Sequence, residues 1–168
     1  GRRPDDGGVL LDQALDVERV TKRFFAELSG HHKRIEAAVD KLGSRPELGA
    51  AISRAGGASR VALRLVTQVL FCYFVQRKGL MERRRDWLSE QFCGHRQRIA
   101  ADRATGRYYQ EVLEPLFYDT FAVPVGRRAG VFADHDLPFL NGGLFERLYG
   151  DVSLPLDDGL FSVDGGLL

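Results

Sequence analysis

Apolar residues recur at three- and four-residue steps between Asp16 and Leu42, a spacing that predicts an amphipathic helix. The repeat consists of Val17, Val20, Phe24, Leu28, Ile35, Val39 and Leu42. Ser29-Gly30 interrupts it, so we expect the helix to split or kink there. A shorter helix is expected at about 46–54, because Pro46 suits the first turn of a helix.

Residues 58–78 contain the most apolar run of the chain, and it is too long for a buried strand. Its helical circumference is apolar almost all round, apart from a narrow polar stripe of Arg64, Thr67 and Gln68. A helix of this kind needs neighbours on several sides, so we predict that it is the buried centre of the fold. On that basis a charge at Leu70 or Phe74 is expected to unfold the protein. The 61–75 core of the run is shorter than the ~20 residues of a membrane span, and we expect no membrane partner.

Two more helices are indicated further along the chain. One follows Asp86 and gives way to polar sequence from Gly94 to Gly106, and the other covers about 108–121 with a kink expected at Pro115. Glycine and proline punctuate the chain after Val123. We therefore predict an all-α fold, an irregular helical bundle around a buried central helix over residues 16–122. A flexible tail over 1–15 precedes it and a loop-rich segment over 123–168 follows it.

Composition adds little that is specific. The 168 residues are 44% hydrophobic with a formal net charge of +1, which is ordinary for a soluble globular protein and gives no global attraction to nucleic acid or membrane. The polar start at 1–8 does not resemble a signal peptide. Cys72 and Cys93 are lone cysteines without metal-ligand spacing. We therefore expect a cytoplasmic protein.

Motifs that carry chemistry are missing from the sequence. It contains no Gly-rich phosphate loop, no Gly-x-Ser-x-Gly motif and no histidine pair at i, i+4 spacing. Asp134-His135-Asp136 is the most metal-like triplet, but such residues in a polar turn are usually solvated. We predict no catalytic residue and no metal site in this chain.

Basic residues gather at the end of the central helix and beyond it. If they converge in space they form a patch that faces phosphate groups, and the alternative is a solvated surface with arginines paired to nearby acidic residues such as Glu82, Asp86 or Glu90. The candidates for contact with the DNA backbone are Arg77, Lys78, Arg83, Arg84, Arg85, Arg96 and Arg98.

The segment 137–146, Leu-Pro-Phe-Leu-Asn-Gly-Gly-Leu-Phe-Glu, combines a turn signal with large apolar flanks. Two interpretations stay open: a turn packed on the chain's own core, or a turn that docks onto another domain. We expect Gly142 and Gly143 to supply backbone angles or close approach that a Cβ would obstruct. The candidate docking residues are Leu140, Asn141, Gly142, Gly143, Leu144 and Phe145.

Three ordered segments resemble one protein family. Residues 62–80 resemble a Leu/Phe-rich helix ending in Gln-Lys/Arg-Lys-Gly, residues 108–118 a Tyr-Tyr … Leu-x-Pro-Leu-Phe helix, and residues 137–145 a Pro-Tyr/Phe-Leu-Asn-Gly-Gly-Leu-Phe signature. Residues 17–25 fit the same region. This order is similar to the helical region upstream of the methyltransferase domain in type IIG restriction–modification enzymes and related phage-defence adenine-specific DNA methyltransferases.

The resemblance implies a scaffold and not an active site. The family's catalytic Asn-Pro-Pro-Tyr/Phe motif and its cofactor-binding glycines lie outside the matched region and do not occur in this chain. S-adenosylmethionine is therefore implied for the parent enzyme, with or without endonuclease activity, and not for this fragment. The implied partners are the adjoining methyltransferase domain and double-stranded DNA. The alternative is a free-standing helical protein-interaction module that does not contact DNA.

Overall fold

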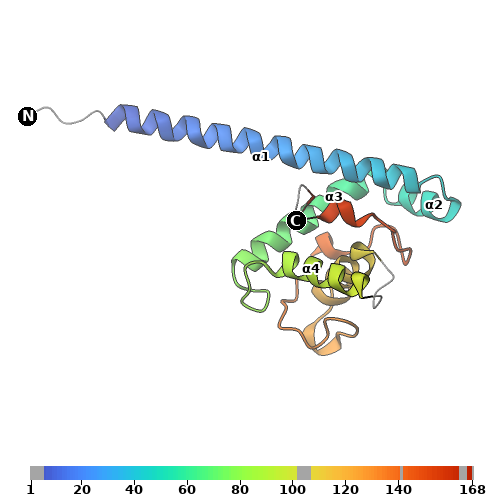
Figure 1. The fold of residues 1–168 in the computed structure, drawn as a ribbon. Coiled ribbons are helices and arrows are strands. Elements are labelled where there is room, and N and C mark those ends of the chain that lie inside the picture. The colour runs from blue at the N-terminus through green and yellow to red at the C-terminus, as the bar shows by residue number, and fades with distance from the viewer. Residues whose placement is uncertain (1–5, 102–106, 141, 163–165, 168) are drawn as a thin grey trace, which may run out of the picture.

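The structure is a computed structural model that describes residues 6–101, 107–140, 142–162 and 166–167, with the backbone alone for residues 6–15. Over these ranges the chain forms helices and loops and contains no strand. The predicted all-α fold is therefore confirmed. A long first helix lies across one side of a body made by all the other elements (Figure 1).

Helix α1, Asp6–Leu42, is continuous for 37 residues, which corresponds to a length of about 55 Å. Two expectations about this region are wrong: the helix neither splits at Ser29-Gly30 nor begins at residue 16 after a flexible tail. One glycine inside a helix costs only about 1 kcal/mol relative to alanine, which does not stop a long helix. Residues 1–5 of the predicted tail lie outside the described residues.

Helices α2, Pro46–Arg54, and α3, Ala58–Arg77, come after α1 in the chain. Gly56 and Gly57 both have a φ of 94°, a conformation that favours glycine, and they reverse the chain between the two helices. The start of α3 lies against α1, where the His32 Nε2 atom is 3.1 Å from the Ser59 carbonyl oxygen. From there α3 crosses below α1 and enters the body (Figure 1).

Helix α3 is the central helix, but the prediction that it is buried on nearly all sides is wrong. Leu63 and Phe74 are 58% and 56% exposed, and they lie on one stripe of the helix with the exposed Thr67. The other faces contact α1, α2 and the segments Trp87–Ala100 and Gly143–Phe145, and no described segment covers this stripe. Two polar residues are buried instead, Gln68 and Gln76, each 1% exposed.

Helix α3 has the length and composition of a membrane span, contrary to the expectation from its 61–75 run. Its buried face nevertheless packs against other parts of the chain, as the core helix of a soluble protein does. Gln76 also ties α3 to the next helix, because its Oε1 atom accepts a 3.1 Å hydrogen bond from the Leu88 backbone N–H.

Helix α4, Trp87–Ala100, continues through Gly94 into the polar stretch for which the sequence predicts no helix. The next helical segment consists of η1, Tyr109–Leu113, and η2, Pro115–Phe121, both of π-helical geometry. Pro115 is the first residue of η2, and the π-helical geometry already begins before it, at Tyr109. The kink expected at Pro115 stays a prediction.

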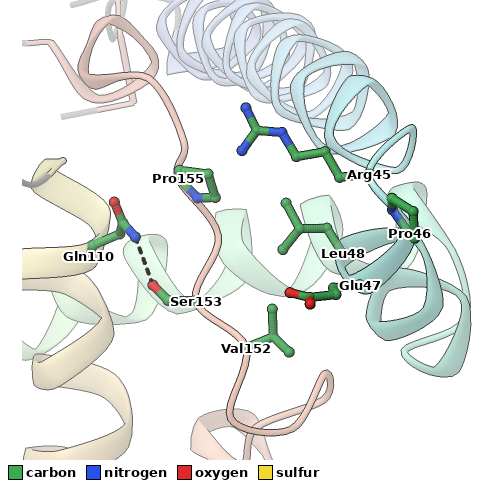
Figure 2. Close-up of a pocket in the computed structure, with 8 residues that line it drawn as sticks. All are labelled: Arg45, Pro46, Glu47, Leu48, Gln110, Val152, Ser153 and Pro155. Carbon is green, nitrogen blue, oxygen red and sulfur yellow. Dashed lines mark hydrogen bonds between the residues drawn. The ribbon is translucent and has the colours of Figure 1, made fainter.

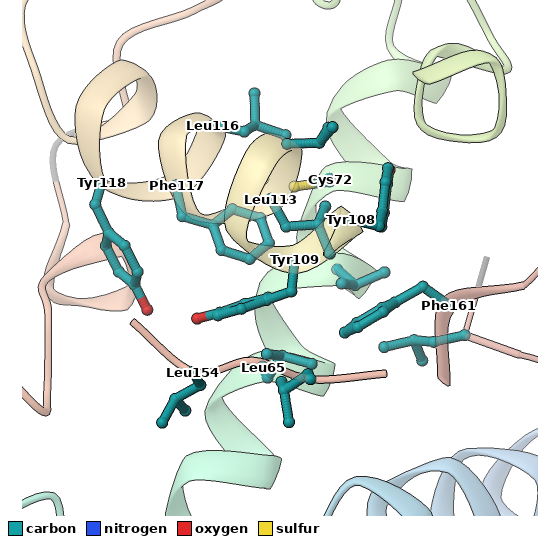
Figure 3. Close-up of a cluster of buried hydrophobic side chains, with 14 of the residues drawn as sticks. Leu65, Cys72, Tyr108, Tyr109, Leu113, Leu116, Phe117, Tyr118, Leu154 and Phe161 are labelled. Atoms are coloured by element: carbon teal, nitrogen blue, oxygen red, sulfur yellow. The ribbon is translucent and has the colours of Figure 1, made fainter. Parts of the chain in front are cut away.

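The loop-rich segment after residue 123 is part of the same core as the helices (Figure 3). It contains the short 3₁₀ turns η3, Val125–Arg127, η4, Gly143–Phe145, and η5, Asp158–Phe161. Tyr109 of η1 stacks on Phe161 of η5 with ring centroids 6.1 Å apart. Eight apolar side chains are buried among the residues of this segment that the structure describes: Phe132, Leu137, Phe145, Tyr149, Leu154, Leu156, Phe161 and Leu167.

Two aspartate substitutions on α3 test this burial pattern. Val69→Asp should unfold the protein, because Val69 is 0% exposed and an unpaired buried charge costs several kcal/mol, a large part of the stability of a domain. Phe74→Asp, at a position 56% exposed on the same helix, should shift the thermal midpoint by only a few degrees. Thermal unfolding followed by circular dichroism measures both, and equal midpoints for the two variants would contradict the assigned faces of α3.

Candidate functional site

The connection between α3 and α4 has an unusual backbone conformation. Glu82 and Arg83 adopt φ values of 52° and 58°, in the left-handed region that residues other than glycine rarely occupy. Three contacts hold Glu82 there: its N–H donates to the Asp136 carbonyl at 3.1 Å, and its carboxylate accepts from Trp87 Nε1 at 2.9 Å and lies 2.8 Å from His135 Nδ1. Because the surrounding structure fixes this turn, the basic residues that follow Glu82 start from a fixed backbone.

Five of the seven basic candidates lie at the end of α3 or in this connection, and all five are exposed: Arg77, Lys78, Arg83, Arg84 and Arg85. Arg84 pairs with Glu90 at 2.7 Å, and the Lys78 Nζ atom lies 5.5 Å from the centre of the Phe74 ring. No hydrogen bond or ion pair with another described residue engages the side chain of Arg83 or Arg85. We define these five residues as the cationic turn.

The other two candidates, Arg96 and Arg98, lie in the second half of α4. Arg96 is separated from Trp87 by a rise of roughly 14 Å along the helix, and its Nη1 atom is 3.8 Å from the Asp158 carboxylate. Arg98 is half-buried beside a groove that Glu111 and His135 also line. Five candidates therefore lie near one another because they are close in the chain, and the other two lie on the second half of α4.

Two polar residues of α3, Arg64 and Gln68, bind the 137–146 segment. Both belong to the narrow polar stripe that the sequence analysis identifies on this helix. Gln68 Nε2 donates to the Leu144 carbonyl at 2.9 Å, and Arg64 Nη2 donates to the Glu146 carbonyl at 3.1 Å. On the other side, the Leu140 N–H donates to the Phe121 carbonyl at 2.8 Å. The segment is thus bonded to both α3 and η2.

Phe145 lies at the centre of this contact and is 2% exposed. Its ring centroid is 5.9 Å from that of Phe71 on α3, 5.8 Å from that of Phe117 and 5.2 Å from that of Phe121 on η2. The Phe145 side of the turn is therefore packed on the chain's own core. Leu140 and Leu144 are half-buried against the same core.

The glycine side of the turn differs from the sequence prediction. Gly142 has a φ of −173°, which is ordinary extended backbone, and a Cβ added there meets no atom within 4 Å. A Cβ on Gly143 meets only the Glu146 carboxylate, at 3.9 Å. Both glycines are exposed, so nothing within this chain obstructs a Cβ there, and obstruction by a docked domain stays a prediction. Asn141 lies outside the described residues, and docking of the turn onto another domain stays a prediction.

The role of Arg64 and Gln68 is what the sequence reasoning missed. A signal for it was present, because two polar residues at i, i+4 spacing stand within an otherwise apolar helix. Buried polar side chains are nearly always hydrogen-bonded, so a buried helix with such a pair predicts a partner that offers free backbone groups. A glycine-rich turn offers such groups.

A groove of about 520 Å³ lies where the start of α2 meets η1 and the 152–155 loop (Figure 2). Gln110 Nε2 donates to Ser153 Oγ at 3.2 Å across one side of it. Ser153 in turn donates to Glu114, whose carboxylate also accepts from Arg147 at 3.0 Å. Burial raises the pKa of Glu114, although its bonds to Ser153 and Arg147 act in the opposite direction. These polar groups are bonded to one another, so they serve to fix the 147–153 loop on η1.

Two more buried polar groups near the core have structural partners. The hydroxyls of Tyr109 and Tyr149 are hydrogen-bonded to each other, and burial raises the pKa of both, which keeps them neutral. His95 is 0% exposed, with Nε2 3.3 Å from Asp158 and Nδ1 3.4 Å from Glu111. Asp158 also accepts from the Tyr108 N–H at 2.8 Å. His95 and Asp158 thereby join α4, η1 and η5.

No group of histidine, cysteine and carboxylate side chains among the described residues has the arrangement of a metal site. In the Asp134-His135-Asp136 triplet, His135 contacts Glu82 and the Phe132 ring. Comparison of the whole chain with known protein families, with curated proteins and with solved structures finds no match.

Two phenylalanine-to-alanine substitutions test the packing of the 137–146 segment. Phe145→Ala should lower the free energy of unfolding by about 3–5 kcal/mol, the usual cost of removing a buried aromatic side chain. Phe139→Ala is the matched control, because Phe139 is 40% exposed, and it should cost about 1 kcal/mol or less. Urea denaturation gives both values. Comparable losses for the two variants would show that Phe145 is not the anchor of the segment.

Proposed function

We propose that this chain is a non-catalytic helical scaffold of a bacterial adenine-specific DNA methyltransferase of the restriction–modification class, and that its cationic turn contacts the DNA backbone. The observation that carries the proposal is the packing around Phe145. The three segments that resemble the family, 62–80, 108–118 and 137–145, meet there as α3, η1–η2 and the 137–146 segment. An ordered trio of short motifs gains weight when the motifs form one contact.

The cationic turn supports the DNA contact through its exposure and its fixed backbone. Arginine and lysine side chains that project from a rigid turn can bind phosphates without a large ordering cost. Contacts to phosphate position a protein on the duplex and carry no sequence information. A scaffold of this kind orients the DNA, and base recognition belongs to other parts of the parent enzyme.

The parent enzyme supplies the chemistry in this proposal. S-adenosylmethionine binds to its methyltransferase domain, in the cytoplasm, and this chain provides neither the methyl donor site nor the target-base pocket. The exposed glycine side of the 137–146 segment is the surface offered to that domain, because Gly142 and Gly143 leave open space that this chain does not use.

DNA binding by the isolated chain should be weak, independent of sequence and sensitive to salt. Removing the two unengaged arginines with Arg83→Ala and Arg85→Ala should lower the slope of log affinity against log salt by about two units, one for each phosphate that is no longer neutralised. The matched control is Arg54→Ala with Arg60→Ala, which removes the same charge at the α2–α3 end of the molecule and should leave the slope closer to wild type. Titration of labelled duplex by fluorescence anisotropy measures the slopes. If both double variants behave alike, the cationic turn is an ordinary solvated surface.

The isolated chain should not bind S-adenosylmethionine. The family's cofactor-binding glycines do not occur in the sequence, so isothermal titration at micromolar protein should give no saturable heat. Binding of the cofactor with one-to-one stoichiometry would contradict the scaffold proposal.

Substitution of both exposed glycines tests the docking role. Gly142→Val together with Gly143→Val should leave the thermal midpoint of the isolated chain almost unchanged, because both side chains enter open space. In the parent enzyme the same double variant should reduce the rate of DNA methylation by impairing the contact with the methyltransferase domain. Unchanged methylation would remove the docking role.

A free-standing protein-interaction module is the second candidate function, and one observation favours it. Between Val17 and Phe25, α1 carries apolar side chains that no described part of the chain covers, among them Val20 and Phe25, 68% and 61% exposed. Exposed apolar surface of this kind is typical of sites of protein contact. If the titration above detects no DNA binding at any salt concentration, the result favours this second candidate.

A further inference from the structure

An exposed aromatic ring lies beside the cationic turn. Phe74 is 56% exposed near the end of α3, and Arg77 and Lys78 follow it by three and four positions, so both lie one turn further along the same face of the helix. The Lys78 Nζ atom is 5.5 Å from the centre of the Phe74 ring. Among the described residues none covers this end of the stripe, so the ring and the two cations form one accessible surface.

The charge around this surface favours an anionic ligand. Between Arg77 and Asp86 the chain carries five basic residues and two acidic ones, Glu82 and Asp86. The Glu82 carboxylate is already engaged within the chain, where it accepts a hydrogen bond from Trp87 at 2.9 Å. A ligand that matches both the cations and the exposed ring of Phe74 offers phosphates together with flat aromatic rings. A strand of nucleic acid has this chemistry.

The ring distinguishes an unpaired strand from a duplex. Phosphate contacts alone favour the duplex, because its charge density along the axis is higher than that of a single strand. The faces of bases in a duplex are covered by their neighbours, and exposing one requires the base to leave the stack. The bases of a single strand are open, and they stack on exposed aromatic side chains. Phe74 therefore adds a contact that a single strand makes and an intact duplex does not.

The contact between Lys78 and the Phe74 ring does not prevent stacking. A cation–π contact at an exposed site is weaker than the stacking of a base on an aromatic side chain, so a base can displace the ammonium group from the ring. The displaced ammonium group then becomes available to a phosphate of the same strand. One contact within the chain is thereby exchanged for two contacts with the ligand.

We propose that Phe74 stacks on a base of an unpaired DNA strand while Arg77 and Lys78 contact its phosphates, so that this surface prefers single-stranded to duplex DNA. The inference rests on the proposed contact between the cationic turn and the DNA backbone. It adds the kind of strand that is bound and the residue that selects it. Every base has a π-face, so the selection acts on strandedness and not on sequence.

Binding of three labelled ligands to the full 168-residue chain tests the proposal by fluorescence anisotropy. The ligands are a single strand of about 16 nucleotides, a duplex of the same length and an abasic single strand that keeps the phosphates and lacks the bases. At one salt concentration, the wild-type chain should bind the single strand more tightly than the duplex and about fivefold more tightly than the abasic strand, the lower end of the effect of one stacked base. Phe74→Leu should lower the affinity for the single strand about fivefold and leave the other two affinities unchanged.

Three variants control for fold and chemistry. The thermal midpoint of Phe74→Leu should stay within a few degrees of wild type, because the side chain is more than half exposed. Phe74→Trp retains an aromatic face and should keep the preference for the single strand. Phe25→Leu removes a ring that is 61% exposed on α1, outside the cationic turn, and should bind all three ligands like wild type.

The outcomes separate this inference from the DNA contact on which it rests. Equal wild-type affinities for the single strand and the abasic strand, or equal losses of single-strand and duplex affinity in Phe74→Leu, would overturn the stacking role of Phe74 and leave the DNA contact standing. Tighter wild-type binding of the duplex than of the single strand would overturn the proposed preference. Absence of binding to all three ligands would overturn the DNA contact and this inference together.

Discussion

The structure depends on the docking of the 137–146 segment between α3 and η2. Phe145 supplies the apolar part of this contact, and Arg64 and Gln68 supply the polar part by binding two carbonyls of the segment. The two parts need each other, because a turn cannot be buried unless its backbone groups find partners. Arg64 and Gln68 are one helical turn apart, so a single face of α3 provides both hydrogen bonds.

This contact explains why the chain has a single hydrophobic core although a large part of it forms loops. In the described part of the segment after residue 123 the only regular elements are short 3₁₀ turns, yet this part buries aromatic and leucine side chains from Phe132 to Leu167. Loops usually run over the surface because their backbone groups need water or partners. Here the partners are side chains of the helices and of the segment itself: Gln68 of α3 donates to the Leu144 carbonyl, and Arg128 donates to the carbonyls of Val123 and Leu137.

The surface features fall into two separate regions with different chemistry. The cationic turn is rigid and polar, and the left-handed conformations of Glu82 and Arg83 are held by contacts to Trp87, His135 and Asp136. The other region, between Val17 and Phe25 on α1, exposes apolar side chains and projects from the body.

The sequence by itself determined the class of fold and the positions of α2 and α3. Short-range information is enough for this, since the spacing of apolar residues and the positions of proline and glycine act within a few residues, and α2 and α3 begin at the expected positions, Pro46 and Ala58. Periodicity could not show which apolar positions stay exposed. Leu63 and Phe74 look like core residues until the neighbours of α3 are placed, and only the tertiary structure leaves their stripe uncovered. The same is true of Arg64 and Gln68, whose partners in the 137–146 segment only the tertiary structure identifies. These outcomes depend on contacts between residues far apart in the chain, such as Gln68 and Leu144, which are 76 positions apart. No local pattern encodes such contacts.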